Sequence, residues 1–241
     1  MLLSGDRGIS NVTAHAENDG TRLSLLTATS AGPEALQLSL RPEGRGRRLT
    51  LRAADGGALL HGADLVDSIR GGRLSLDAIY DDTRPTTPLA GTARLENFTV
   101  LNAPVIGKLL QAMTIYGVVD AMRGPGLAFS DMIMPFRWEA GVLDLQETRA
   151  FSASLGITAR GRIDTGRKTL NVAGTVVPAY LLNSLLGRIP LLGRLFSNER
   201  GGGLVAVDYT IRGPLADPAV GVNPLSALTP GFLRGLFHLF D

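Results

Sequence analysis

Apolar and polar residues alternate along most of the chain. Between residues 73 and 80, Leu74, Leu76 and Ala78 occupy one parity, while Arg73 and Asp77 occupy the other. A period of two residues predicts a β-strand with one apolar and one polar face. The same pattern recurs at residues 36–40, 49–53, 141–146, 155–164, 169–176 and 204–213.

Turn-forming residues separate these predicted strands. Gly, Pro, Asp and Asn are concentrated at residues 41–46, 81–88, 164–168 and 198–203. The short loop at 164–168 predicts a β-hairpin. Because the segments between strands are too short for repeated helical crossovers, we expect antiparallel pairing rather than a parallel doubly wound sheet.

Helical signals interrupt the strands at residues 56–70, 104–123, 178–196 and 224–241. The segment 178–196 is strongly apolar, but it is not a continuous membrane span. Arg188, Pro190 and Arg194 interrupt it, whereas a transmembrane helix needs about 20 predominantly apolar residues. Because Pro190 lacks a backbone donor, we expect two short elements joined by a bend.

Composition narrows the class of protein. Apolar residues make up 44% of the chain, which is enough for a sizeable core. The formal net charge is only +2, so the protein generates little net field to attract nucleic acid. The chain has no cysteine, which excludes disulfides, thiolate catalysis and cysteine metal sites.

Residues typical of catalysis form no recognisable pattern. His15, His61 and His238 are far apart in the sequence and lack metal-ligand spacing. Asp81 and Asp82 could form a metal or acid/base pair, although a solvated turn is the simpler interpretation. We therefore predict no enzyme activity, no catalytic residue, no metal site and no cofactor.

An arginine-rich stretch contains Arg41, Arg45, Arg47, Arg48 and Arg52. These side chains could face the phosphate groups of lipid or nucleic acid, or form a solvated face. Arg48 and Arg52 have the polar parity of their strand, which favours the solvated face. Nucleic acid is disfavoured further because few aromatic residues lie nearby.

Several phrases of the sequence resemble the C-terminal region of the large bacterial AsmA-like proteins, most closely the YhdP branch. They include "NAP" at 102–104, "GLAFSDM" at 126–132, "VVPAYLLNSL" at 176–185 and "NPLSALTPGFLR" at 223–234. The resemblance extends over roughly residues 5–241. It implies an inner-membrane-anchored, periplasmic protein with a long β-groove, implicated in moving phospholipid toward the outer membrane.

The resemblance and the sequence pattern together predict a single AsmA-like C-terminal domain over residues 1–241. We expect it to be part of a longer chain that carries the membrane anchor. The predicted fold class is α+β, mainly β with α: a twisted, curved antiparallel sheet that forms an apolar groove. Three or four short amphipathic helices are expected to cover or terminate this sheet.

This interpretation implies a non-enzymatic lipid-transfer module of the cell envelope. It would guide phospholipid acyl chains along the groove between inner and outer membrane, without directional contacts. The residues expected to line the groove are Leu74, Leu76, Leu143, Leu145, Leu155, Ile157, Leu170, Val172, Val205 and Val207.

The segments 178–196 and 224–241 are candidates for contact with a membrane surface, with arginines directed toward lipid phosphate. The alternative is an envelope scaffold, in which the helices cap the sheet and the domain binds another envelope protein. The membrane-facing candidates are Leu181, Leu182, Leu185, Leu186, Arg188, Leu191, Leu192, Arg194, Leu195, Phe196, Phe232 and Phe237.

Overall fold

The structure is a computed structural model that describes residues 8–32, 34–101, 126–153, 155–178 and 206–223. This part of the chain forms 12 strands and a single short helix, α1 (Gly56–Gly62). The strands are β1 (Val12–Asn18), β2 (Leu23–Ser30), β3 (Gln37–Glu43), β4 (Gly46–Ala53), β5 (Ile69–Asp81), β6 (Leu89–Val100), β7 (Leu127–Glu139), β8 (Val142–Ser152), β9 (Leu155–Asp164), β10 (Thr169–Pro178), β11 (Val207–Pro214) and β12 (Ala219–Asn223).

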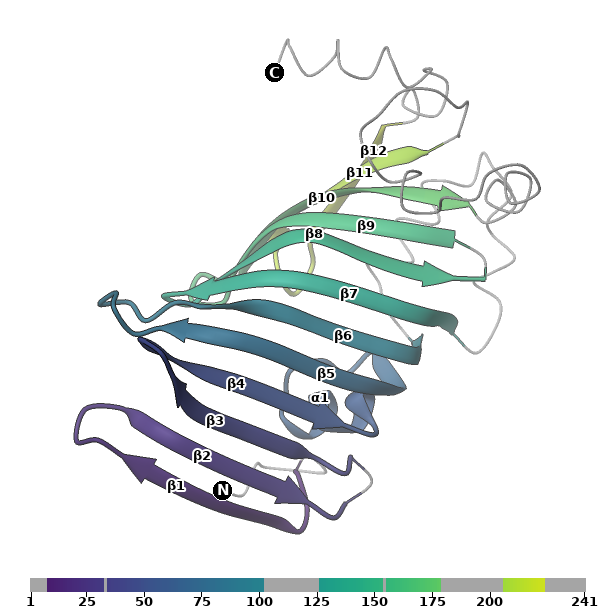
Figure 1. The fold of residues 1–241 in the computed structure, drawn as a ribbon. Coiled ribbons are helices and arrows are strands. Elements are labelled where there is room, and N and C mark those ends of the chain that lie inside the picture. The colour runs from purple at the N-terminus through teal and green to yellow at the C-terminus, as the bar shows by residue number, and fades with distance from the viewer. Residues whose placement is uncertain (1–7, 33, 102–125, 154, 179–205, 224–241) are drawn as a thin grey trace, which may run out of the picture.

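All the strands belong to one sheet, and their spatial order from β1 to β12 is their order in the sequence. Every neighbouring pair is antiparallel, so the described chain is a meander. The sheet is twisted and curved along its length (Figure 1). The antiparallel pairing expected from the short turns is therefore present.

The two ends of the strands differ. Short turns connect β1 to β2, β3 to β4, and each later odd-numbered strand to the next, all at one end, which we call the turn rim. The helix α1 connects β4 to β5 at the opposite end, which we call the α1 rim. The ends of β6, β10 and β12, and the starts of β7 and β11, also lie at the α1 rim because the strands alternate in direction.

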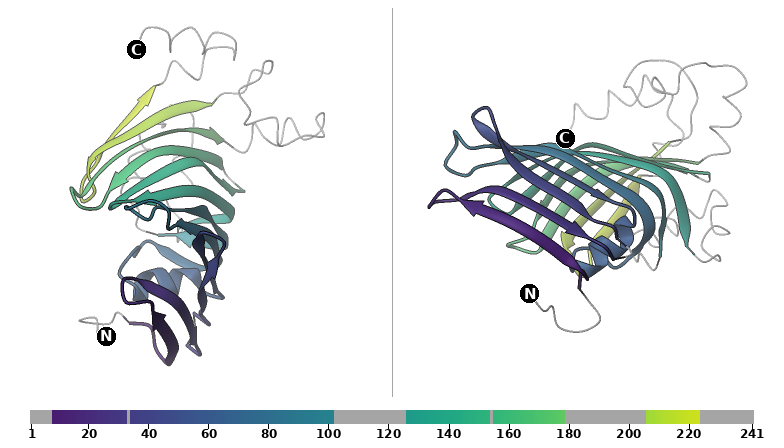
Figure 2. Two further views of the ribbon diagram at one scale, coloured as in Figure 1. Left: turned by 60° about the vertical axis from the view of Figure 1, so that its left-hand side comes forward. Right: turned by 60° about the horizontal axis from the view of Figure 1, so that its bottom comes forward.

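The helix α1 packs on one face of the sheet, which we call the inner face. Leu59 of α1 is buried with Leu36 and Ala53, and Leu51 and Leu74 pack against this cluster. The inner face is the concave side of the curved sheet (Figure 2).

Local sequence explains the position of α1. Asp55 caps its N-terminus, where the carboxylate accepts a hydrogen bond from the Ala58 N–H at 2.8 Å. A Cβ at Gly56 would lie 2.7 Å from both Leu74 Cβ and Leu95 Cδ1. The absence of a side chain at Gly56 therefore allows α1 to lie directly against the sheet.

The predicted α+β class with three or four helices is wrong for the part of the chain that the structure describes, which is almost entirely antiparallel β-sheet. Within the expected helix at 56–70, only Gly56–Gly62 is helical. Asp64 adopts a φ of 57°, in the left-handed region that ends helices, and β5 begins at Ile69. The helices expected at 104–123, within 178–196 and at 224–241 lie outside the described residues, except that Pro178 is the last residue of β10.

Glycines allow close backbone approach where the sheet bends. Gly91 lies opposite Phe136, and Gly174 lies opposite Tyr209. A Cβ at Gly174 would lie 1.9 Å from the carbonyl oxygen of Thr158, so no larger residue fits without moving the backbone. A large aromatic residue opposite each glycine supplies the side-chain volume that the glycine lacks.

Candidate functional site

A row of apolar residues crosses the inner face near the α1 rim. Residues that pair directly in neighbouring strands share a face of the sheet. The pairing therefore defines one continuous row, which consists of Ala53, Leu74, Leu95, Met132, Ala150, Ile157, Val176 and Val207.

A second row crosses the inner face near the turn rim. It contains Trp138, the only tryptophan of the chain. Trp138 packs against a buried cluster of Ala78, Leu89 and Phe136. In order of pairing, the row consists of Tyr80, Leu89, Trp138, Leu143, Ile163 and Leu170.

The structure brings the predicted groove residues together on the inner face, apart from Val205, which lies outside the described residues. The sheet has one layer in the described chain, and much of this apolar face is only half-buried. The buried members are Leu145, Leu155, Val172 and Val207. The half-buried members are Leu74, Leu76, Leu143, Ile157 and Leu170. Whether these residues contact lipid remains a prediction.

The strands β6 and β7, which contribute central inner-face residues, were not predicted from the sequence. Leu95 is fully buried, and the rings of Phe98 and Phe129 stack with centroids 5.2 Å apart. A signal was available, since Met132, Met134, Phe136 and Trp138 alternate with other residues in "DMIMPFRWE". This stretch contains Pro135, which weakens a strand assignment from sequence alone.

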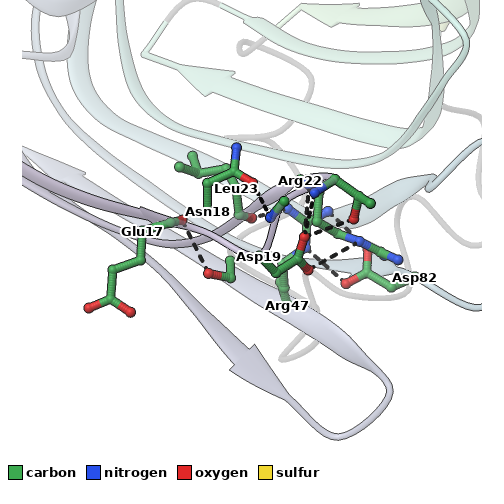
Figure 3. Close-up of polar contacts among 10 residues, drawn as sticks. Glu17, Asn18, Asp19, Arg22, Leu23, Arg47 and Asp82 are labelled. Atoms are coloured by element: carbon green, nitrogen blue, oxygen red, sulfur yellow. Dashed lines mark hydrogen bonds and ion pairs between the residues drawn. The ribbon is translucent and has the colours of Figure 1, made fainter.

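Arg47 is an exception to the apolar character of the inner face. It pairs with Tyr80 in the register of β4 and β5, and its guanidinium carbon lies 4.7 Å from the centroid of the Tyr80 ring. Its Nε and Nη2 donate hydrogen bonds to the two carboxylate oxygens of Asp82, at 2.8 and 2.9 Å. Its Nη1 donates to the carbonyl oxygen of Leu23 at 2.6 Å (Figure 3).

These contacts link β2, β4 and the turn after β5. Arg22, at the β1–β2 turn, also contacts Asp82, with Nη1 3.1 Å from Oδ1. The pKa of Asp82 is lower than its ordinary value, mainly because the carboxylate accepts hydrogen bonds from Arg47. Asp82 is therefore the ion-pair partner of Arg47 and Arg22. The neighbouring Asp81 instead accepts a hydrogen bond from the Thr83 N–H at 3.1 Å.

The outer face carries paired charges. Arg48 binds Asp77 through two hydrogen bonds of 2.9 and 3.0 Å, and it also contacts Glu43. Arg94 binds Asp131 across β6 and β7 at 2.8 Å. The position of Arg48 agrees with its polar parity, and its carboxylate partners explain why its pKa is raised.

The residues considered for catalysis are separated in the structure. His15 lies on β1 beside Glu17, and His61 lies on α1 beside Asp67. His238 lies outside the described residues. Among the residues that the structure describes, no group of three or more His, Asp or Glu side chains is placed to hold a metal ion.

The predicted membrane-facing residues all lie outside the described residues, so the structure does not place them. No helix in the described ranges has the length and apolar character needed to cross a bilayer. Comparisons of this chain with protein-family models, with curated proteins and with solved structures give no match.

Proposed function

We propose that this protein is a non-enzymatic lipid-transfer module that holds phospholipid acyl chains on the inner face of its sheet. One observation carries the proposal: the inner face is predominantly apolar from β5 to β12. In the described residues of these strands, no charged side chain belongs to this face. The charged side chains of these strands lie instead on the outer face or at the turns, where some form ion pairs, such as Arg94 with Asp131 and Arg162 with Asp144.

The physical basis of the proposal is the transfer of hydrocarbon from water to an apolar surface. Each buried methylene contributes about 0.8 kcal/mol, so an acyl chain gains much more from such a surface than a short side chain does. Half-buried residues such as Leu76, Leu143 and Leu170 supply that surface. Because dispersion and hydrophobic contacts have no preferred direction, a bound chain can move along the face.

The cellular setting of this function is also a proposal, and it rests on the resemblance to AsmA-like proteins. We place the protein in the periplasm, at the inner membrane. Its proposed partners are phospholipid, a membrane surface and an envelope protein. The segments 178–196 and 224–241 are the proposed sites of membrane contact.

The position of Trp138 allows a direct test. Mixing the full chain with a phospholipid brominated on its acyl chains should quench the fluorescence of Trp138, because the side chain lies on the inner face. A matched control moves the tryptophan to the outer face by combining Trp138→Phe with Thr92→Trp. Thr92 pairs with Asp77, on the exposed face of β5 and β6, so quenching should be lost.

Equal quenching of the two proteins would mean that lipid does not distinguish the faces. Absence of quenching at Trp138 would reject acyl-chain binding on the inner face. Either result would remove the basis of the transfer function.

A scaffold that binds an envelope protein is the second candidate. Every residue of β1 is exposed, and β1 is an edge strand of the described sheet. An exposed edge can pair with a strand from a partner. The double variant Ala14→Pro, Ala16→Pro should abolish such pairing while leaving lipid quenching at Trp138 unchanged.

A further inference from the structure

A shallow, open pocket lies on the outer face of the sheet, over β8 to β11. These four strands are consecutive neighbours in the sheet (Figure 1). The volume of the pocket is about 660 Å³, which is a common size for a small-molecule site. Its lining includes Asp144, Glu147, Arg160, Asn171, Ala173 and Arg212.

A bulge and a small residue make room for this pocket. The register of β8 against β9 shifts between Leu145 and Thr148, and such a bulge bends its strand. On β10, Ala173 pairs with Arg160 of β9 on one side and with Thr210 of β11 on the other. Because Ala173 carries only a methyl group, the space between the longer outer-face side chains stays open.

Both carboxylates in the pocket lining already have arginine partners. Asp144 Oδ2 lies 3.3 Å from Nε of Arg162, and Glu147 Oε1 lies 2.7 Å from Nη2 of Arg149. Neither of these two arginines belongs to the lining. The negative charges of the pocket are therefore offset by cations outside it.

The two arginines of the lining are exposed and have no carboxylate partner. Among the residues that the structure describes, the side chain of Arg160 makes no ion pair or hydrogen bond. The Nε of Arg212 donates a hydrogen bond to Asn171 Oδ1 at 3.1 Å. This bond orients the guanidinium and leaves its two terminal nitrogens for another acceptor. Within the described chain, two positive charges of the pocket therefore lack a negative counterpart.

The positions of these arginines allow both to contact one anion. Arg160 pairs with Ala173 and Arg212 pairs with Asn171, so β10 separates them and they are offset by two residues. Strand spacing and rise place their Cα atoms roughly 12 Å apart, a gap that two arginine side chains can close around one group. Guanidinium nitrogens match the oxygens of a phosphate, and a phosphate monoester carries about −1.5 to −2 charge at pH 7.

We propose that Arg160 and Arg212 bind the phosphate of a phosphate monoester in this outer-face pocket, with the organic group of the ester in the remaining volume. The site lies on the face opposite to the proposed acyl-chain surface and does not depend on it. A soluble phosphate ester and the headgroup of phosphatidic acid share this chemistry.

The test uses one probe from each source, glycerol 3-phosphate and dihexanoyl phosphatidic acid. Isothermal titration calorimetry on the full chain should detect binding of at least one probe. The double variant Arg160→Gln, Arg212→Gln should weaken that binding at least about 10-fold, because it removes two charge-assisted contacts. The matched control Arg41→Gln, Arg52→Gln removes two exposed arginines of β3 and β4, and affinity should stay within about 2-fold because salt screens distant charges.

The two probes separate the sources of the phosphate. Similar affinity for both, lost in the Arg160→Gln, Arg212→Gln variant, identifies a soluble ester. Binding of the lipid probe alone, also lost in that variant, identifies a lipid headgroup. The inference is overturned if wild type binds neither probe, or if the variant binds as tightly as wild type. Equal unfolding midpoints of the variant and wild type show that a loss of binding is not a loss of fold.

A variant that gains affinity supplies a second test. Asp144→Asn removes a negative charge from the lining and frees Arg162, so whichever probe binds wild type should bind about 2- to 5-fold more tightly. Misfolding cannot produce such a gain. Unchanged or weaker binding by Asp144→Asn would contradict an anion in this pocket.

Discussion

Arg47 and Asp82 form a two-point ion pair that fastens β4 to the turn after β5, with side chains that are only 11% and 14% exposed. Breaking a largely buried pair is costly because the remaining charge loses its partner. Asp82→Asn should therefore lower the free energy of unfolding by about 3 kcal/mol, measured by urea denaturation. The control Asp81→Asn, at the last residue of β5 next to Asp82, should cost less than about 1 kcal/mol. Equal losses of unfolding free energy in Asp82→Asn and Asp81→Asn would show that the ion pair does not specifically connect β4 to this turn.

The same pair predicts a dependence of stability on pH. Arg47 lowers the pKa of Asp82 in the folded state below its ordinary value of 3.8. The stabilisation is therefore present above that ordinary pKa and is lost as the pH falls through the lower, folded value. Urea midpoints measured from pH 6 downward should fall less steeply for Asp82→Asn than for wild type. Parallel curves would contradict the prediction.

Gly174 should be much less tolerant of substitution than a glycine in a turn. A Cβ at Gly174 would lie 1.9 Å from Thr158 O and would also meet the Tyr209 hydroxyl at 2.8 Å. Gly174→Ala should reduce the free energy of unfolding by more than about 2 kcal/mol. At Gly166 the nearest atom would be 3.4 Å away, so Gly166→Ala should stay within about 0.5 kcal/mol. Similar unfolding midpoints for the two variants would exclude a close contact at Gly174.

The phenol of Tyr209 should lose its proton at a higher pH than an ordinary tyrosine does. Burial raises its pKa to about 12 because the phenolate would lose its hydration. The unfolded state loses its proton first, so this contribution to stability is complete below pH of about 10 and is lost as the pH rises through the folded pKa. Ultraviolet titration of wild type against Tyr209→Phe should reveal one late phenolate transition in the difference. A difference transition near the ordinary tyrosine pKa would contradict the burial of Tyr209.

The sequence was most informative in strands whose apolar and polar residues alternate regularly. Leu74 and Leu76, or Leu155 and Ile157, were assigned to one face from their parity alone, because side chains of a strand point alternately to opposite faces. The predicted hairpin at 164–168 likewise follows from turn chemistry, and the structure joins β9 to β10 there. The prediction of helix from 56 to 70 failed after Gly62, because helical spacing does not reveal where a left-handed residue ends the helix.

Parity also fails to predict which face a side chain occupies where a strand contains a bulge. The bulge in β8 moves Thr148 to the inner face, and no composition signal in "LDLQETRA" marks the extra residue. Thr158 has the polar parity of β9, yet its hydroxyl accepts a hydrogen bond from β10. Such contacts depend on the register between strands that are distant in sequence.

The sequence by itself therefore determined which residues form the regularly alternating strands, such as β5 and β9, where turns such as 164–168 lie, and which side chains of those strands share a face, because these properties depend on neighbouring residues. Only the tertiary structure decided that the strands form one continuous sheet, that α1 packs on its apolar face and that Arg47 reaches across to Leu23 and Asp82. Those outcomes depend on strand register and on close backbone approach at residues such as Gly56 and Gly174. Both are long-range properties that a local pattern does not encode.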